Sequence, residues 1–492
     1  MTDQADNPNV IAKPGDYNLD VVKILSYRKN DSEGRLYEYD IKPIVLTVEL
    51  TEDIFNGFMS GNIIVKDAQD IRSVLPITGL EKLELKFSTP GMPGVKAVRE
   101  EGHPFHIYKI EGVQVDPTNP RAQFYNIYFC SKEMFYNSFN RVSRAYTGPI
   151  EESVERVIRD VDGLNSKKLF LYEPTKTNTK FVIPNKKPLN AINLMSEKAI
   201  SGSYNNAGYL FYETPTGFHF RSIESMLALG GAVARPSIFK YNYQIANTQD
   251  QDIETDLKNV IRYHFERPAN TLFNLNEGMY ANKLITHDSF NKTIEETDFD
   301  YMDTFGTFFH TEHEDGFKSA EKTTLPYSKF DGQPFDISQK ANAKLMTATN
   351  TSKIHNDYEI IRPKDYLQSR LSQRLQLRNV NLNLQVFGNS LITAGCIINF
   401  EMPYLRPLGD NELPENNPYW SGRYLVMGVK HTISQEDERY EMSLKCMKDA
   451  VRTPYEAEIE NTSVTEREYE QSVLNIYEAD SDYLKDDLLG EL

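Results

Sequence analysis

Cysteine is scarce in this chain of 492 residues, which contains only three. Cys130, Cys396 and Cys446 lie far apart and form no CxxC pair, so the sequence indicates neither a zinc site nor a redox dithiol. We expect two of them in strands, where a free thiol packs as a small hydrophobic group.

Long apolar runs are also missing. No stretch approaches the roughly 20 residues that a membrane helix needs. The N-terminal residues are polar and acidic, without the basic start and apolar core of a signal peptide. We therefore expect no membrane anchor, and folding in a reducing cytoplasm.

The motifs of the common enzyme classes are absent: there is no P-loop, dinucleotide fingerprint, nucleophile elbow or HExxH. His103 with His106, and His310 with His313, form close pairs, but no third ligand follows at metal-site spacing, which favours polar surface loops. Residues 298–303 lack the glycine and closing glutamate of a calcium loop. A glycosidase needs two flanking carboxylates, and among 71 acidic residues spacing selects no pair. We expect no enzyme, no cofactor and no metal.

Positive charge is in deficit, because 54 basic residues face 71 acidic ones and the net charge is −17. Such a chain repels nucleic-acid phosphates and suits a wall past which DNA slides without sticking. The densest basic stretch, "QSRLSQRLQLR" at 368–378, is more typical of a helix face or edge strand than of a phosphate-binding patch.

Period-two alternation is abundant. Residues 424–429 and 440–447 alternate apolar side chains, with the polar linker "ISQEDER" between them, which predicts a β-hairpin. The surrounding stretch 371–449 predicts a small antiparallel barrel or rolled sheet. Five alternating runs between 37 and 130 predict a second unit of similar size, without a residue-by-residue repeat.

A loop between two runs of the first unit carries four large apolar side chains. Ile54, Phe55, Phe58 and Met59 either cap the end of the barrel or contact another subunit, because exposed apolar patches usually mark interfaces. Both interpretations remain open at this point.

Helical and hairpin patterns lie between the two units. Residues 131–146 and 148–161 predict helices, the second with Ile150, Val154, Val157, Ile158 and Val161 on one face and Pro149 in its first turn. Residues 185–201 predict a third helix, with Asn185 as a possible cap and an apolar face of Leu189, Ile192 and Met195. Residues 208–223 predict a hairpin. Together they indicate a compact α+β unit.

The fold class expected is mainly β with an α+β part. The expected domains are a flexible arm (1–16), a first tube-like barrel (17–135), a middle α+β domain (136–235), a second barrel (236–265 and 367–452) interrupted by an insertion (266–366), and an acidic tail (453–492). Residues 455–492 contain twelve acidic and two basic residues. The candidate partner-binding residues of this tail are Leu474, Ile476, Tyr477, Leu484 and Leu488.

Several of these stretches resemble a known family. The run "LTEDIFNGFMSGNIIVKD" and its continuation to 91, residues 188–226, "GNSLITAGCIINFEMP" and residues 421–450 are similar to baseplate hub (tail hub) proteins of contractile-tailed bacteriophages. The resemblance covers most of 17–452 and leaves out the insertion and the tail. It rests on structural patterns and not on catalytic signatures.

The resemblance implies two tail-tube-like β-barrels per chain and a homotrimer, which joins a sixfold tail tube to a threefold central spike and continues the DNA channel. It implies as partners the tail tube protein, the central spike protein, neighbouring baseplate proteins and the tape measure protein, with genomic DNA passing through unbound. The expected location is the virion tail, assembled in the host cytoplasm. Two alternatives stay open: a spike or hub protein of a contractile secretion system, and a tail-associated cell-wall hydrolase.

Overall fold

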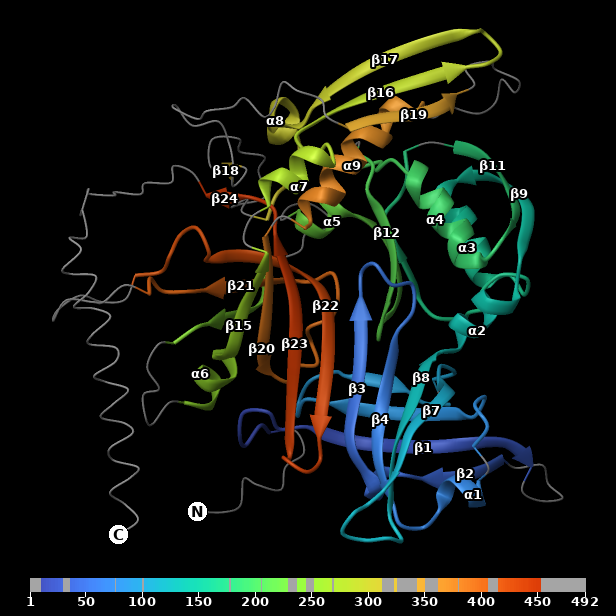
Figure 1. The fold of residues 1–492 in the computed structure, drawn as a ribbon, viewed down its shortest axis with the longest axis vertical. Helices are drawn as coiled ribbons and strands as arrows, with labels where there is room; N and C mark the ends of the chain where they lie inside the picture. Colours follow the sequence, from blue (N-terminus) through green and yellow to red (C-terminus); the bar gives the residue numbers. More distant parts are fainter. Residues whose placement is uncertain are drawn as a thin grey trace. The chain divides into compact units, whose positions relative to one another are not determined.

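The structure is a computed structural model. It describes residues 10–29, 36–75, 77–99, 101–176, 178–204, 206–228, 237–244, 252–267, 270–311, 323–324, 343–349, 362–378, 380–405 and 415–452. Antiparallel strands dominate these residues, with helices gathered in the middle and inserted parts (Figure 1). The expected fold class, mainly β with an α+β part, is confirmed.

The first β unit follows the alternating runs of the sequence. Its elements are β1 (Asn18–Lys29), β2 (Leu36–Asp40), η1 (Lys42–Ile44), β3 (Val45–Asp53), β4 (Ser60–Asp67), α1 (Ile71–Val74), β5 (Lys82–Ser88), β6 (Val95–Ala97), β7 (Phe105–Val115) and β8 (Gln123–Ser131). The strand order is β3-β4-β8-β7-β5-β1-β2, and β6 pairs with β5. The alternation in β4 buries Ile63 and Val65 and leaves Lys66 exposed, as period two requires.

The second β unit is built from two separated stretches. Its elements are β14 (Ser237–Asn242), α6 (Ile253–Lys258), β15 (Val260–Arg267), β20 (Val380–Phe387), β21 (Ile397–Glu401), β22 (Gly422–Ser434) and β23 (Arg439–Lys448). β22 and β23 form the predicted hairpin, with Ser434 opposite Arg439. β14 and β15 do not form a ladder among the described residues. A single isolated bridge joins Asn242, at the end of β14, to Asn259, just before β15.

The two β units share one sheet. β22 pairs antiparallel with β3, from Gly428 opposite Asp53 to Ser434 opposite Thr47. This junction produces a 14-stranded sheet in which β2 lies at one end of the strand path and β15 at the other. Edge-to-edge pairing satisfies the backbone groups that each unit alone would leave open.

The middle domain packs helices against short sheets. Its elements are α2 (Lys132–Phe139), β9 (Val142–Pro149), α3 (Ile150–Arg159), β10 (Phe170–Tyr172), β11 (Asn178–Lys186), α4 (Pro188–Lys198), β12 (Tyr209–Thr214), β13 (Gly217–Ser222) and α5 (Ile223–Leu227). The helix predicted for 131–146 is correct only up to Phe139. Residues 142–149 instead form a strand, because β11 offers them a ladder.

The helices α3 and α4 were largely predictable from their apolar spacing. Ile150, Val154, Val157 and Ile158 are buried, but Val161 is 72% exposed because the helix ends at Arg159. In α4, Ile192 and Met195 are buried as expected. Lys187, and not Asn185, precedes the first turn.

The insertion forms a small sheet with helices. Its elements are α7 (Thr271–Asn276), β16 (Ala281–Asp288), β17 (Thr293–Asp300), α8 (Tyr301–Thr304), η2 (Phe305–Thr307), β18 (Thr323–Thr324) and β19 (Ala343–Thr349). β16 pairs antiparallel with β17 and parallel with β19. β18 pairs with β24 (Val451–Arg452).

The basic stretch that follows is a helix and not a strand. After η3 (Pro363–Asp365), α9 (Leu367–Gln376) packs Leu371 and Leu375 against Tyr280 and Tyr301 of the insertion. The buried side chains of α9 are mostly polar: Gln368, Ser372, Gln373 and Gln376, with Leu375. Arg370 and Arg374 of the same helix are partly exposed.

Candidate assembly surfaces

The apolar loop between β3 and β4 is mostly an internal junction. Ile54, Phe58 and Met59 are buried, and each enters a different hydrophobic core. Ile54 packs with residues of β12 and β22, Phe58 with the middle domain, and Met59 with the shared core of the β units. A Cβ added to Gly57 would lie 2.6 Å from Leu189 Cδ1, so α4 approaches the loop closely.

Only Phe55 of the four remains available to another molecule. Its side chain is 42% exposed, and it lines a cavity beside α9. Contact with a neighbouring subunit therefore stays a prediction for Phe55. For Ile54, Phe58 and Met59 the burial supports the alternative in which the loop is part of its own chain's core.

A buried ion cluster fastens this loop to the middle domain. Lys168 Nζ lies 2.9 Å from Glu133 Oε2 of α2 and also binds Glu213 of β12. The second oxygen of Glu213 accepts the backbone N–H of Met59 at 3.0 Å. Burial alone would lower the pKa of Lys168, but the two carboxylates hold it above its ordinary value, so the ammonium stays charged.

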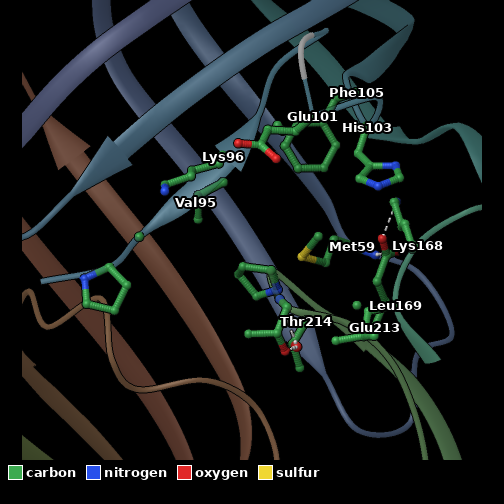
Figure 2. Close-up of a pocket in the computed structure, with 16 residues that line it drawn as sticks. Met59, Val95, Lys96, Glu101, His103, Phe105, Lys168, Leu169, Glu213 and Thr214 are labelled. Carbon is green, nitrogen blue, oxygen red and sulfur yellow. Dashed lines mark hydrogen bonds and ion pairs between the residues drawn. The ribbon is translucent and has the colours of Figure 1, made fainter. Parts of the chain in front are cut away.

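The ion cluster forms one wall of a cavity of about 360 Å³ (Figure 2). In Figure 2 the labelled Lys96 lies on the opposite side from Lys168 and Glu213, and His103 lies beside Lys168. Burial and the charge of Lys168 lower the pKa of His103. For His106, burial and then the charge of Lys82 lower the pKa to about 4, so both imidazoles are neutral at pH 7.

A second polar cluster lies where the two β units join. Tyr440 donates its hydroxyl proton to His431 Nδ1 at 2.7 Å, and His431 Nε2 donates to Glu52 Oε1 at 3.0 Å. The other Glu52 oxygen accepts the N–H of Ala394 at 3.2 Å. Burial, and then the Glu52 charge, raise the pKa of Tyr440 well above its ordinary value, so the phenol keeps the proton that it donates.

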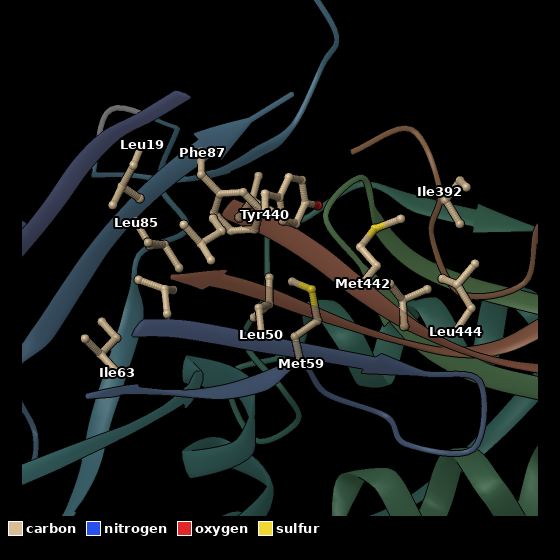
Figure 3. Packing of buried hydrophobic residues seen from close by; sticks show 14 of the residues in the cluster. Leu19, Leu50, Met59, Ile63, Leu85, Phe87, Ile392, Tyr440, Met442 and Leu444 are labelled. Atoms are coloured by element: carbon tan, nitrogen blue, oxygen red, sulfur yellow. The ribbon is translucent and has the colours of Figure 1, made fainter. Parts of the chain in front are cut away.

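This junction cluster is fully paired and surrounded by hydrophobic side chains. Figure 3 shows Tyr440 among Phe87, Leu50 and Met442, which come from both β units. The Phe87 and Tyr440 rings meet edge to face with centroids 5.9 Å apart. The cluster resembles a catalytic triad only in its order of hydrogen bonds; its burial makes it a fastening between β3, β22 and β23.

His310 is buried, which corrects the surface loop expected for it. Its Nδ1 lies 2.9 Å from Asp449 Oδ2, and its Nε2 donates to the carbonyl of Phe305 at 2.8 Å. Thr311 donates its N–H and its hydroxyl to the other Asp449 oxygen. His313 lies outside the described residues. No cluster of three or more metal-ligating side chains occurs among the residues described.

The basic stretch contains a row of three arginines, two on α9 and Arg378 in the turn that follows the helix. Arg370, Arg374 and Arg378 line a cavity of about 510 Å³ together with Phe55 and Glu197. Within the part of the chain that the structure describes, none of the three forms an ion pair. The signal in the sequence was their spacing of four residues, which places side chains on one helix face.

The tail residues proposed to bind a partner, Leu474, Ile476, Tyr477, Leu484 and Leu488, lie outside the described residues. No helix in the described ranges has the length and apolar character to cross a membrane.

Comparison with known proteins gives similar structures only. No protein-family model matches the chain, and no curated protein gives a significant match. A tail protein from Neisseria meningitidis MC58 is 10% identical with a TM-score of 0.49, over 88% of this chain and 97% of its own. The prophage MuSo2 43 kDa tail protein from Shewanella oneidensis is 7% identical with a TM-score of 0.48, over 88% and 99%.

A component of the type VI secretion system from E. coli is also similar, at 9% identity and a TM-score of 0.36, over 88% of this chain and 76% of its own. Solved structures that this chain is similar to are thus phage tail and secretion-machine proteins. Because all three TM-scores are below 0.5, we base the function on the residues of the chain itself.

Proposed function

We propose that this chain is a structural hub protein of a phage tail baseplate. In this proposal three copies form a ring that joins a sixfold tail tube to a threefold spike and continues the DNA channel. The observation that carries it is the β3–β22 junction, through which one chain builds two β units into a single sheet. Three such chains supply the six units that a sixfold neighbour requires, which a dimer could not.

The ends of the sheet support repeated assembly. β2 has β1 as its partner among the described strands, and its other edge is unpaired there. An open strand edge pairs readily with another chain, so closing it against a neighbour removes an aggregation hazard. The net charge of −17 suits a channel lined by polar and acidic groups, because it offers DNA phosphates no basic trap.

The buried polar groups of the chain favour a structural role over an enzymatic one. The three buried polar clusters described above have paired acid and base groups that hold elements together, as Glu52 with His431 does. Release of muropeptides from peptidoglycan by the purified protein, abolished by one carboxylate substitution, would instead establish the hydrolase alternative. The neighbouring genes, encoding tail or secretion components, distinguish the phage hub from its secretion-system counterpart.

Imaging tests the proposal directly. Particles of the chain mixed with its tube and spike proteins should show a ring of six lobes around an open channel continuous with the tube. A closed centre, or a ring with twofold symmetry, would contradict it. Both partners are needed in the sample, because the ring is expected to require them for assembly.

A further inference from the structure

The arginines of the basic stretch form a regularly spaced row. Arg370 and Arg374 lie four residues apart on α9, so their Cα atoms are separated by a rise of about 6 Å, and Arg378 follows in the turn after the helix. Phe55 and Glu197 also line the 510 Å³ cavity that the row lines. The cavity therefore combines a line of positive charge with an aromatic side chain.

No ion pair within the described residues balances the positive charge of this row, although the charge of Glu197 acts on Arg370 and Arg374. The Nε atom of Arg370 is buried and has no hydrogen-bond partner. Burial and then the charge of Arg374 lower the pKa of Arg370 to about 10, and burial and Arg378 lower that of Arg374. Among the described residues, Glu197 is the one carboxylate that lines the cavity. A buried guanidinium nitrogen without an acceptor is costly, so a ligand that brings carboxylates would stabilise the site.

The cavity also offers apolar surface to a ligand. Phe55 is 42% exposed, and Leu345 and Leu371 are half-buried in the same wall. A polyphosphate would leave this surface unused, and the net charge of −17 repels a long polyanion from a distance. The site fits an acidic peptide that carries a large apolar side chain between its carboxylates.

The sequence contains such a peptide. Two runs of alternating glutamates flank an apolar residue: Glu456, Glu458 and Glu460 around Ile459, and Glu466, Glu468 and Glu470 around Tyr469. When extended, a peptide places every second side chain about 6.6 Å apart on one side, close to the step of the arginine row. Charge sign and spacing thus match, while Ile459 and Tyr469 fall on the opposite side of the extended peptide from the glutamates, as does Arg467.

We propose that the arginine cavity of one copy binds residues 455–472 of another copy of this chain. The glutamates form charge-assisted hydrogen bonds with the guanidinium groups. The proposal rests on the hub function only because it requires copies of the chain to meet. The binding measurement below does not require a trimer, so the tail-binding proposal and the hub proposal can fail separately.

Peptide binding by the full-length chain is the first test. In the receptor, the six glutamates named above are replaced with Gln, so its own tail does not compete. A fluorescent peptide of residues 455–472 should bind, with an affinity that falls as salt rises. Arg370→Gln with Arg374→Gln should weaken binding about tenfold or more. Arg121→Gln, which removes an exposed arginine between β7 and β8, should leave it unchanged. No binding, or equal binding by the row variant, would overturn the proposal.

Charge exchange tests whether the contact joins two copies. Arg374→Glu alone and Glu468→Arg alone should each reduce concentration-dependent association in sedimentation velocity, and a mixture of the two variants should restore part of it. Failure of the mixture to recover association would reject the contact between copies. Binding of a single-stranded oligonucleotide, lost in the row variant while the peptide does not bind, would reassign the row to nucleic acid and overturn the proposal.

Discussion

The junction of the β units and the arginine row differ in whether their buried charged groups have hydrogen-bond partners. At the junction, Glu52 is fully buried and each carboxylate oxygen accepts a hydrogen bond, from His431 and from Ala394. On α9, Arg370, half-buried, has a buried Nε without a partner. Charge that is satisfied inside the chain fastens its elements, whereas charge left unsatisfied at a cavity is available for another molecule.

The largest effect should follow from breaking the junction. Glu52→Ala leaves the His431 ring and the Ala394 N–H buried without acceptors, which should lower the free energy of unfolding by about 3 kcal/mol. Denaturant unfolding of both proteins measures the difference. Glu49→Ala on the same strand is the control, because Glu49 pairs with Lys430 at 2.7 Å in a partly exposed site and should cost less than about 1 kcal/mol. Equal costs for the two variants would refute the fastening role of the junction.

The second largest effect on stability should come from the apolar loop, where Phe58 and Phe55 should respond differently to substitution. Phe58 is 5% exposed, so Phe58→Asp places a charge in the middle-domain core and should cost about 4 kcal/mol or unfold the domain. Phe55→Asp should change stability by about 0.5 kcal/mol at most, while weakening assembly. Melting curves and particle imaging check the two effects. A Phe55 variant that assembles normally would show that this residue makes no contact between subunits.

Lowering the pH should reduce the stability contributed by paired carboxylates such as Asp449, and should not change the charge of the arginines. Burial raises the pKa of Asp449, but the charge and hydrogen bonds of His310, with the hydrogen bonds of Thr311, outweigh it and hold the pKa below its ordinary value. A carboxyl with a lowered folded pKa contributes stability above its unfolded pKa of about 3.9 and loses it as the pH falls.

Unfolding of wild type and Asp449→Asn at several pH values tests this. The variant should be less stable by about 2 kcal/mol at pH 7, with the gap shrinking as the pH falls below about 4. A gap that stays constant into acid would show that Asp449 does not contribute through its charge.

The smallest effect on stability should come from the arginine row. Arg374→Gln removes a like-charge neighbour of Arg370 and Arg378, so the free energy of unfolding should stay unchanged or rise by up to about 0.5 kcal/mol. Thermal melting at low and high salt measures it. A loss of more than about 1 kcal/mol would mean that the row already has partners within its own chain.

Local sequence patterns correctly predicted those strands and helices whose conformation does not depend on pairing with a distant segment. Alternation identified β22 and β23, and apolar spacing identified α3 and α4. The prediction of helix for residues 142–146 was wrong, because the ladder with β11, and not their own pattern, makes them part of β9.

Long-range partners were beyond prediction from the sequence. His310 meets Asp449 across 139 residues, and Glu52 meets His431 across 379. For the same reason the loop residues Phe55 and Phe58 looked alike in sequence, although the fold buries one and exposes the other. The arginine row was interpreted only as a helix face or edge strand, although its four-residue spacing is a local feature of the sequence.

The mass of the hub bound to its spike tests the central claim most directly. Native mass spectrometry of the chain purified with its spike protein should give three hub copies per complex, since two β units per chain must supply six. A stable complex whose number of hub copies is not a multiple of three would contradict the account.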